Sequence, residues 1–424
     1  MAVLLIFLFL LVIQVPIALV LGMTGISYLG IEGNTILLST APQRLFSGIE
    51  SYSLLAIPLF MLAGELMNSG GITARLISFA KSFLGHFRGG LAYVNVIANM
   101  FLASILGSAT AQTAMMTRVM VPEMERGGYK REFATATTAA AALLGPIIPP
   151  SMLFIIYAVG SGVSISAMFI AGILPGILLA GGMIVLIAIL GYIHKFPRSE
   201  RGTFKQIVIN FLKAVPALLV PIIIVGGILS GVFTATESAG VACFLALIVG
   251  FFIYRELKLK DIPRILANAA VATSAVTLLI SMAGLFGWVL TFDQIPQKIV
   301  ESMAALTENK WVFLLLVNLF LLAVGVVMDE MAVMIILLPI FMPLVQAYGI
   351  DPVHFGVVVC LNATIGTITP PVGAVISIGS AVADVKFERL SAALVPFLIV
   401  AIIVLALVTY VPAITTWLPK AFGL

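Results

Sequence analysis

Residues 143–151 read Leu-Leu-Gly-Pro-Ile-Ile-Pro-Pro-Ser and interrupt an apolar run that extends from residue 133 to residue 159. Proline lacks a backbone N–H and clashes with the preceding helical turn, so this segment cannot continue a helix. The flanking residues are together long enough to cross a bilayer. A broken backbone at membrane depth is tolerated only where protein or a watery cavity satisfies the freed N–H and C=O groups. The sequence therefore predicts a broken span with a binding site at the break.

A second segment repeats this interruption later in the chain. Residues 363–373 read Ala-Thr-Ile-Gly-Thr-Ile-Thr-Pro-Pro-Val-Gly. One offset of 221 positions relates the residue pairs Gly145 and Gly366, Pro149 and Pro370, Pro150 and Pro371, Pro122 and Pro343, and Pro175 and Pro396. Paired interruptions in corresponding halves of a chain are typical of the binding site of a secondary transporter.

Composition restricts the class of protein. Of the 424 residues 62% are hydrophobic and 9% are charged, with a mean hydropathy of +1.21. A water-soluble domain cannot bury this much apolar surface, so we expect an all-α polytopic membrane protein. The two cysteines, Cys243 and Cys360, lie in apolar runs, and no disulfide framework is indicated.

Nine full spans are expected near residues 1–29, 50–69, 133–160, 167–194, 206–232, 239–255, 268–291, 355–382 and 390–418. Residues 90–121 and 311–347 are apolar at both ends and polar or glycine-rich in the middle. We interpret each as a re-entrant helical hairpin with its tip near the midplane of the membrane. The alternative for each is a single kinked span.

Basic residues favour the two hairpins. With both hairpins in place, all but four of the 22 lysines and arginines lie on one side, and the exceptions are Arg44, Lys298, Lys310 and Lys420. The positive-inside rule makes the crowded side cytoplasmic. The first hairpin then enters from the cytoplasm and the second from outside, which gives two inverted repeats. We expect a scaffold at 1–89 and 206–310 and a transport domain at 90–205 and 311–424, joined by surface helices at 70–89 and 291–310.

Each hairpin tip is expected to lie against the break in the span that follows it. The first predicted site consists of Ser104, Gly107, Ser108, Gly145, Ile148 and Pro149, and the second of Gly325, Asp329, Gly366, Thr369 and Pro370. Hydroxyl and unwound carbonyl oxygens suit a small cation, and the N-terminal ends of half-helices suit an anion. A cation-coupled carrier of an organic anion fits both. Alternatively, the small residues only allow helices to pack closely.

Asp329 and Glu330 form an acidic pair inside the second apolar hairpin. A carboxylate at that depth is costly, and its usual roles are cation ligand or proton carrier. One of the two could instead cap the second half-helix by accepting its free N–H groups. Both interpretations stay open. The histidines His86, His194 and His354 fall in predicted loops and are too scattered to form a metal site.

The motifs resemble those of one transporter family. They are Gly-Ser-Ala-Thr-Ala at 107–111, Gly-Pro-Ile-Ile-Pro-Pro-Ser at 145–151, Gly-Val-Phe-Thr-Ala-Thr-Glu-Ser-Ala at 231–239 and Gly-Thr-Ile-Thr-Pro-Pro-Val-Gly at 366–373. In this order they resemble the DctM-like large membrane subunit of TRAP transporters over essentially the whole chain. Ala235 departs from the pattern, where the family often has proline.

This resemblance implies an elevator-type carrier of the bacterial inner membrane with no cofactor other than Na⁺ as coupling ion. It implies two partners, a small four-helix membrane subunit and a periplasmic substrate-binding protein. The implied substrate is an organic acid such as sialic acid, which overall similarity favours, or a C4-dicarboxylate. We expect its carboxylate between the two sodium sites, near Ser108, Ala109, Thr110, Thr367 and Thr369.

Other classes of protein fit less well. A primary pump would need a phosphate-binding Gly-x-x-x-x-Gly-Lys-Ser/Thr loop, and the chain contains no Gly-Lys pair. A zinc protease would need His-Glu-x-x-His, which is also missing from the sequence. We therefore do not expect an enzyme. An ion or anion channel and a proton-coupled carrier that works without a binding protein remain as alternatives.

Overall fold

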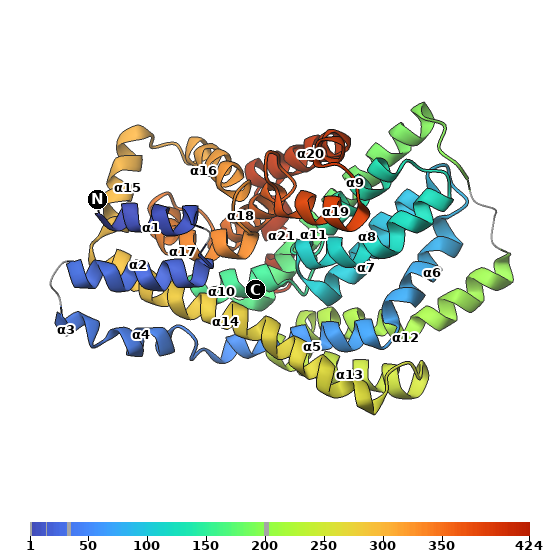
Figure 1. Cartoon of the computed structure of the whole chain (residues 1–424), viewed down its shortest axis with the longest axis horizontal. Helices are drawn as coiled ribbons and strands as arrows, with labels where there is room; N and C mark the ends of the chain where they lie inside the picture. The colour runs from blue at the N-terminus through green and yellow to red at the C-terminus, as the bar shows by residue number, and fades with distance from the viewer. Residues whose placement is uncertain (1, 14, 32–34, 199–202) are drawn as a thin grey trace.

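The computed structural model of the chain describes residues 2–13, 15–31, 35–198 and 203–424, and its regular elements in these ranges are helices (Figure 1). In chain order they are α1 (Ala2–Val12), α2 (Ile17–Ile31), α3 (Thr35–Leu38), α4 (Ala41–Ser47), η1 (Tyr52–Leu55), α5 (Ala56–Ser69), α6 (Ile72–Leu84), α7 (Gly90–Leu106), α8 (Ala109–Arg126), α9 (Arg131–Ala142), α10 (Met152–Ser161), α11 (Ile165–Ile193), α12 (Phe204–Leu229), α13 (Ala235–Ile248), η2 (Val249–Ile253), η3 (Leu259–Asp261), α14 (Ile262–Phe292), α15 (Ile295–Leu306), α16 (Lys310–Gly325), α17 (Glu330–Ala347), α18 (Pro352–Gly366), α19 (Ala374–Ala383), α20 (Phe387–Tyr410) and α21 (Ala413–Ala421). The expectation of an all-α membrane protein is confirmed.

By length and composition, seven of the described helices can cross a membrane, or eight if one bent pair counts as a single span. Most predicted spans correspond to helices, but the single span predicted at 1–29 is wrong. There α1 ends at Val12 and α2 begins at Ile17, with Pro16 just before α2. Because proline has no N–H to donate, it starts a new helix and does not extend the old one. The span predicted at 390–418 also ends early, at Tyr410.

Each predicted broken span and each predicted hairpin consists of two separate helices. Residues 133–160 form α9 and α10 with a break between them, and residues 355–382 form α18 and α19. Each hairpin segment contains two helices joined by a short tip, α7 with α8 and α16 with α17, and the two helices of each pair pack against each other. The bounds of α8, 109–126, become those of α17, 330–347, at the offset of 221 positions seen in the sequence.

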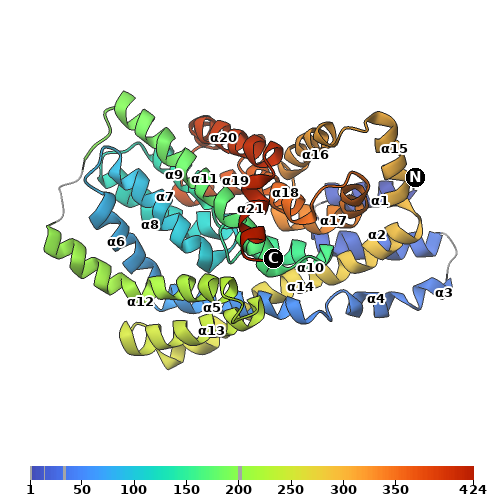
Figure 2. The same ribbon diagram turned by 180° about the vertical axis from the view of Figure 1, so that it is seen from behind.

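Helices of the two halves interlock in the middle of the molecule. Helix α17 of the second hairpin packs against α10 of the first half, and helix α8 of the first hairpin packs against α19 of the second half. Both views show α10 and α18 near the centre (Figures 1 and 2). A second group of helices forms along one edge, where α14 packs against α2, α4 and α5, and α13 packs against α5.

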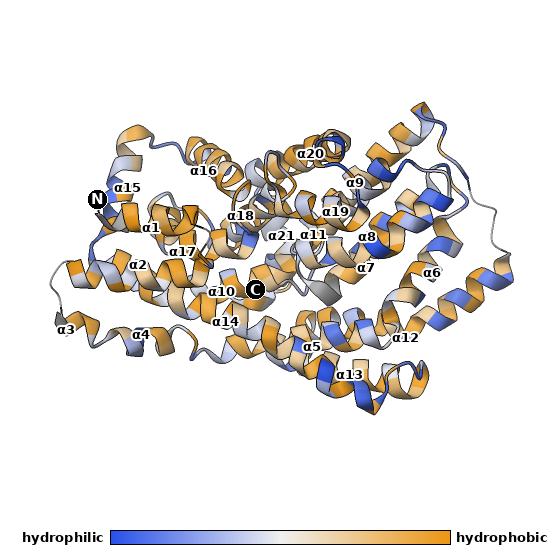
Figure 3. Cartoon of the chain, in the orientation of Figure 1, coloured by the Kyte–Doolittle hydropathy of each residue, from blue (hydrophilic) through white to orange (hydrophobic). Residues whose placement is uncertain are grey.

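Large apolar side chains cover much of the outer surface. Figure 3 shows α2 and α14 largely in the hydrophobic colours. On these two helices the side chains of Met23 and Val271 are exposed. The helices predicted as surface linkers are α6 and α15. In α6 the buried residues Ile72, Leu76 and Ala80 recur every four positions, so one stripe of this helix is covered. The junction between α15 and α16 bends by 119°, which separates the linker from the hairpin.

Candidate functional site: hairpin tips and broken helices

The first tip consists of two residues between α7 and α8. Gly107 ends α7 with a left-handed backbone (φ 60°), and its N–H donates to the carbonyl of Ala103 at 3.2 Å. A side chain in this conformation would be strained, which explains a glycine here. Ser108 is extended and starts α8, and its hydroxyl lies 2.9 Å from that of Thr110. The side chain of Ser104 lies outside the described residues.

This tip touches the first break. A Cβ placed on Gly145 would lie 3.4 Å from the carbonyl oxygen of Ser108, and one on Gly107 would lie 3.0 Å from the side chain of Met152 at the start of α10. The structure therefore brings Gly107, Ser108 and Gly145 together as predicted. The side chain of Ile148 packs instead against Gly176 of α11.

The first break ends in a capped helix. The hydroxyl of Ser151 donates to the carbonyl of Pro146 and accepts from the N–H of Phe154 at 3.2 Å. Its side chain thus satisfies one of the free N–H groups of α10. A protein side chain thus satisfies one carbonyl and one N–H group of the broken backbone, as a break at membrane depth requires.

The second tip touches the second break more closely. A Cβ placed on Gly366 would lie 2.6 Å from the Cα of Gly325. The N–H of Gly373, at the end of the break, donates to the carbonyl of Val326 in the tip at 3.1 Å. The hydroxyl of Thr369 donates to the carbonyl of Ile365 at 2.9 Å, and Pro370 is exposed. Gly325 and Gly366 thus meet as predicted.

The acidic pair has two different surroundings. Asp329 caps α17, because its Oδ1 accepts from the N–H of Met331 at 3.0 Å. Glu330 is 1% exposed, and neither of its carboxylate oxygens has a hydrogen-bond partner. The Glu330 carboxylate lies beside the backbone N–H of Ala109, at the start of α8. Glu330 therefore lies where the second hairpin meets the first.

The five predicted substrate residues fall into two groups. Ser108, Ala109 and Thr110 form the first turn of α8, whereas Thr367 and Thr369 lie in the second break. The hydroxyl of Thr367 donates back to the carbonyl of Thr364 at 2.6 Å. Among the described side chains, no hydrogen bond joins the two groups directly. Glu330 lies beside the first group and was not included in the predicted substrate site.

Sequence reasoning also missed Gln112 on α8. This glutamine is fully buried, and its amide oxygen lies 2.5 Å from the position of a Cβ on Gly145. A long polar side chain one turn beyond the predicted tip was the available signal.

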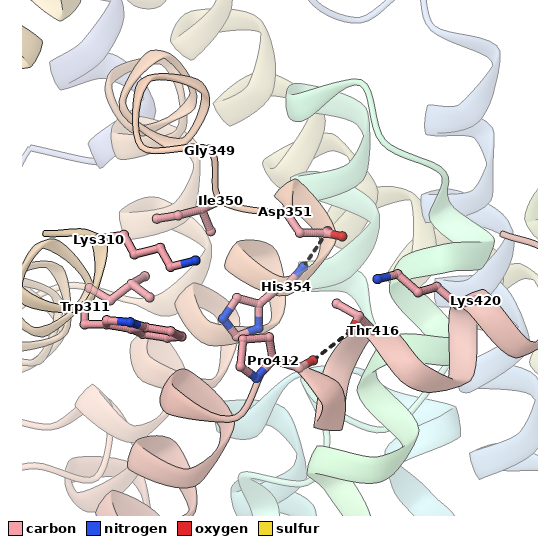
Figure 4. A pocket seen from close by; sticks show the side chains of 10 residues that line it. Lys310, Trp311, Gly349, Ile350, Asp351, His354, Pro412, Thr416 and Lys420 are labelled. Carbon is pink, nitrogen blue, oxygen red and sulfur yellow. Dashed lines mark hydrogen bonds between the residues drawn. The ribbon is translucent and has the colours of Figure 1, made fainter.

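A cavity of about 190 Å³ lies away from the hairpin tips, at the ends of α16, α18 and α21 (Figure 4). Lys310, Asp351, His354 and Lys420 line it, and Asp351 accepts from the N–H groups of Val353 and His354. It contains no residue of the predicted sites. His354 is in the first turn of α18, so its placement in a loop was wrong. Among the described residues, no group of His, Cys, Asp and Glu is arranged to hold a metal ion.

A comparison with known protein families identifies the family of this chain. The model of the family described as "Tripartite ATP-independent periplasmic transporter, DctM component" matches residues 4–414. The chain belongs to this family. This DctM chain is accordingly a transporter subunit and not an enzyme, and it is a multi-pass protein of the inner membrane. The resemblance drawn from the motifs is confirmed.

Relatives of the DctM chain have different substrates in their names. It is 38% identical to the sialic acid TRAP transporter large permease protein SiaM of Vibrio cholerae, over 96% of this chain and 95% of that protein. It is also 38% identical to the C4-dicarboxylate TRAP transporter large permease protein DctM of Pseudomonas aeruginosa, over 93% and 94%. Equal identity to both means that overall similarity does not favour either substrate.

A solved structure shares the fold of the DctM chain. The YdaH transporter of Alcanivorax borkumensis aligns with a TM-score of 0.65 over 92% of this chain and 90% of that one, at 14% identity. At this identity the likeness concerns the fold alone.

Proposed function

We propose that this subunit carries an organic acid into the cell together with sodium ions, by an elevator movement. The observation that carries this proposal is the pair of hairpin tips, each in contact with a broken helix at Gly145 or Gly366. Unwound carbonyls and helix ends at such breaks bind coupling ions and anionic groups in secondary transporters.

Two sodium sites are proposed, one at each tip. The first uses oxygens of Ser108 and the carbonyls of residues 145–149, and the second uses the carbonyls around Gly325 and Gly366 with the oxygens of Asp329 and Thr369. Hard cations take carboxylate and carbonyl oxygens as ligands. The cap that Asp329 provides leaves its second carboxylate oxygen free for this role.

The proposed substrate carboxylate faces the N-terminus of α8 and the second break. Arg118 is exposed and lies more than two turns beyond the start of α8, too far along the helix to reach the tip. Helix ends and bound sodium would then supply the positive potential, so substrate affinity should depend on sodium. Sialic acid and C4-dicarboxylates are the candidates because relatives carry these names.

Calorimetric titration of the purified transporter with each candidate acid tests this coupling. We expect binding in sodium chloride and at least tenfold weaker binding in choline chloride. Equal affinity in both salts would contradict a site shared by ion and substrate. Saturable, sodium-dependent uptake into liposomes would exclude a channel, which needs no such coupling.

The elevator movement requires that residues 90–205 and 311–424 slide as one domain against 1–89 and 206–310. Gly287 of α14 and Pro339 of α17 lie on opposite sides of this proposed boundary, and a Cβ on Gly287 would be 3.5 Å from that of Pro339. This separation suits a disulfide. We expect the G287C/P339C variant to lose uptake when oxidised and to recover it when reduced. Full uptake of the oxidised protein would contradict the movement.

Two partners complete the proposal, a small membrane subunit and a periplasmic binding protein. The family description names a tripartite transporter. The side chains of Phe9 and Val12 on α1 are 62% and 78% exposed, which makes α1 a candidate surface for the small subunit. Reconstitution of the membrane subunits with and without the binding protein tests the second partner. Efficient uptake without it would contradict this part.

A further inference from the structure

The orientation of the Gln112 amide is determined by its hydrogen bonds. The amide nitrogen lies 2.7 Å from the backbone carbonyl oxygen of Asn99 and 2.8 Å from Asn99 Oδ1. A carbonyl oxygen only accepts hydrogen bonds, so the atom that faces it must be the nitrogen. Gln112 Oε1 therefore points away from Asn99.

A chain of donors holds this orientation in place. Asn99 donates to both oxygens of Asn95 at 2.8 Å, Asn95 donates to the hydroxyl of Thr138 at 2.7 Å, and Thr138 donates to the carbonyl of Ala134. Each amide group in this chain therefore donates its N–H groups to the next residue. The oxygen at the end of the chain, Gln112 Oε1, is buried and has no hydrogen-bond partner.

Gln112 Oε1 and two carbonyl oxygens face the same side of Gly145. A Cβ placed on Gly145 would lie 2.5 Å from Gln112 Oε1, 3.2 Å from the carbonyl oxygen of Ala142 and 3.4 Å from that of Ser108. The three oxygens come from the first hairpin and the first broken helix. A buried acceptor without a donor destabilises the folded protein, and a cation bound by all three oxygens would remove this cost.

The second half contains a similar set of hydrogen bonds, at positions that the offset of 221 does not relate to Gln112 or Asn99. Asn362 donates to the backbone oxygen of Asn318 at 3.0 Å and to its Oδ1 at 2.7 Å, and Asn318 donates to the hydroxyl of Thr409 at 3.0 Å. Again the amide oxygen, Asn362 Oδ1, is buried without a partner. Asn362 lies one helical turn before Gly366. Two unrelated sets of side chains thus present an amide oxygen close to a break.

We propose that Gln112 Oε1 is a ligand of an alkali cation held between the first hairpin and the first break, together with the carbonyl oxygens of Ser108 and Ala142. This inference rests on the proposed sodium coupling and adds a side-chain ligand that the sequence did not reveal. Amide and backbone carbonyl oxygens are neutral, hard ligands, which suits a cation of single charge.

The test measures the thermal unfolding midpoint of the purified full-length chain against sodium chloride, with choline chloride at constant total salt. A cation that binds only the folded state raises this midpoint as its concentration increases. The Q112M variant keeps the length of the side chain but removes the oxygen. We expect its half-saturating sodium concentration to rise at least tenfold.

Two further variants separate the oxygen from general effects on the fold. T137V removes a buried hydroxyl of the same helix as Thr138, which donates to the carbonyl of Phe133 and takes no part in the donor chain, so its sodium response should stay within twofold of the wild type. Q112N keeps an amide but draws its oxygen back from Gly145, and it should behave like Q112M. Q112N also replaces Q112M as the decisive variant if Q112M does not fold.

The outcomes distinguish this inference from the proposed function. A wild-type sodium response that Q112M and Q112N leave unchanged would overturn the role of Gln112 while the coupling stands. An equal loss in T137V would also overturn it, because loss of a buried hydroxyl outside the donor chain would then have the same effect as loss of the Gln112 oxygen. A wild type without any sodium response would overturn the coupling itself and the ligand with it.

Discussion

Gly325 and Gly366 meet backbone to backbone, with the Cα of Gly325 only 2.6 Å from where a Cβ of Gly366 would lie. The second hairpin tip and the second broken helix therefore pack as closely as two main chains can. Small residues allow such approaches between helices in membranes. Here they also bring carbonyl groups of the break next to those of the tip, which is the arrangement that a cation site needs.

We expect Gly366→Ala to push this tip away from the break. No flexible side chain can yield, because the Cβ would meet main-chain atoms, so we estimate a loss of about 1–3 kcal/mol in stability together with most of the uptake. Gly181→Ala is the matched control, since a Cβ there meets nothing within 4 Å. Thermal unfolding and uptake measure both effects. A fully active G366A protein would show that the close contact is not needed.

Removal of one hydroxyl at each tip should weaken sodium dependence. We expect Ser108→Ala and Thr369→Ala to raise the sodium concentration for half-maximal uptake several-fold, because each loses one oxygen near the proposed ion. Ser302→Ala on the exposed face of α15 serves as the control. Unchanged sodium activation in both tip variants would exclude the hydroxyls as ligands but not the carbonyls.

Variants of Asp329 separate its cap from its charge. Asp329→Ala removes the acceptor for the N–H of Met331 and should cost about 1 kcal/mol of stability. Asp329→Asn keeps an oxygen acceptor and should keep the stability. We expect both to weaken sodium binding, measured by the sodium-dependent unfolding midpoint. If D329N binds sodium like the wild type, Asp329 is only a cap.

The buried carboxylate of Glu330 should cost stability and serve transport. Neither carboxylate oxygen of Glu330 has a hydrogen-bond partner. Glu330→Gln replaces a buried group that can ionise with a neutral amide. We therefore expect the unfolding midpoint to rise by a few degrees, which corresponds to about 1 kcal/mol of stability. We expect uptake to fall. Glu301→Gln on α15 is exposed and should change neither. Normal uptake by E330Q would assign Glu330 no role in transport.

Ionisation of Tyr129 should lower the stability of the folded protein at alkaline pH. It lies in the loop between α8 and α9 and packs against Phe133 and Phe196. Burial raises the pKa of Tyr129 to about 12. In the unfolded chain the pKa is about 10, so the neutral form that folding favours contributes fully below pH 10 and less as pH rises towards 12. Tyr129→Phe should reduce this loss, measured as unfolding midpoints from pH 8 to 11.

The class of the protein and its chain order follow from the sequence. Apolar spans and helix breaks depend on side-chain hydrophobicity and on the proline ring, which are properties of single residues. The breaks at residues 143–151 and 367–373 were therefore predictable, and so was the offset that relates α8 to α17. The same rule explains the error at residues 1–29, where the effect of Pro16 was overlooked.

Tertiary structure alone decided which groups face one another. Asp329 and Glu330 are neighbours in sequence, yet one caps α17 and the other is buried beside α8. Gln112 has an unpaired oxygen only because Asn99, on another helix, accepts from its nitrogen. Hydrogen-bond direction and close contact depend on how segments far apart in the chain are oriented, and no local pattern of residues specifies that orientation.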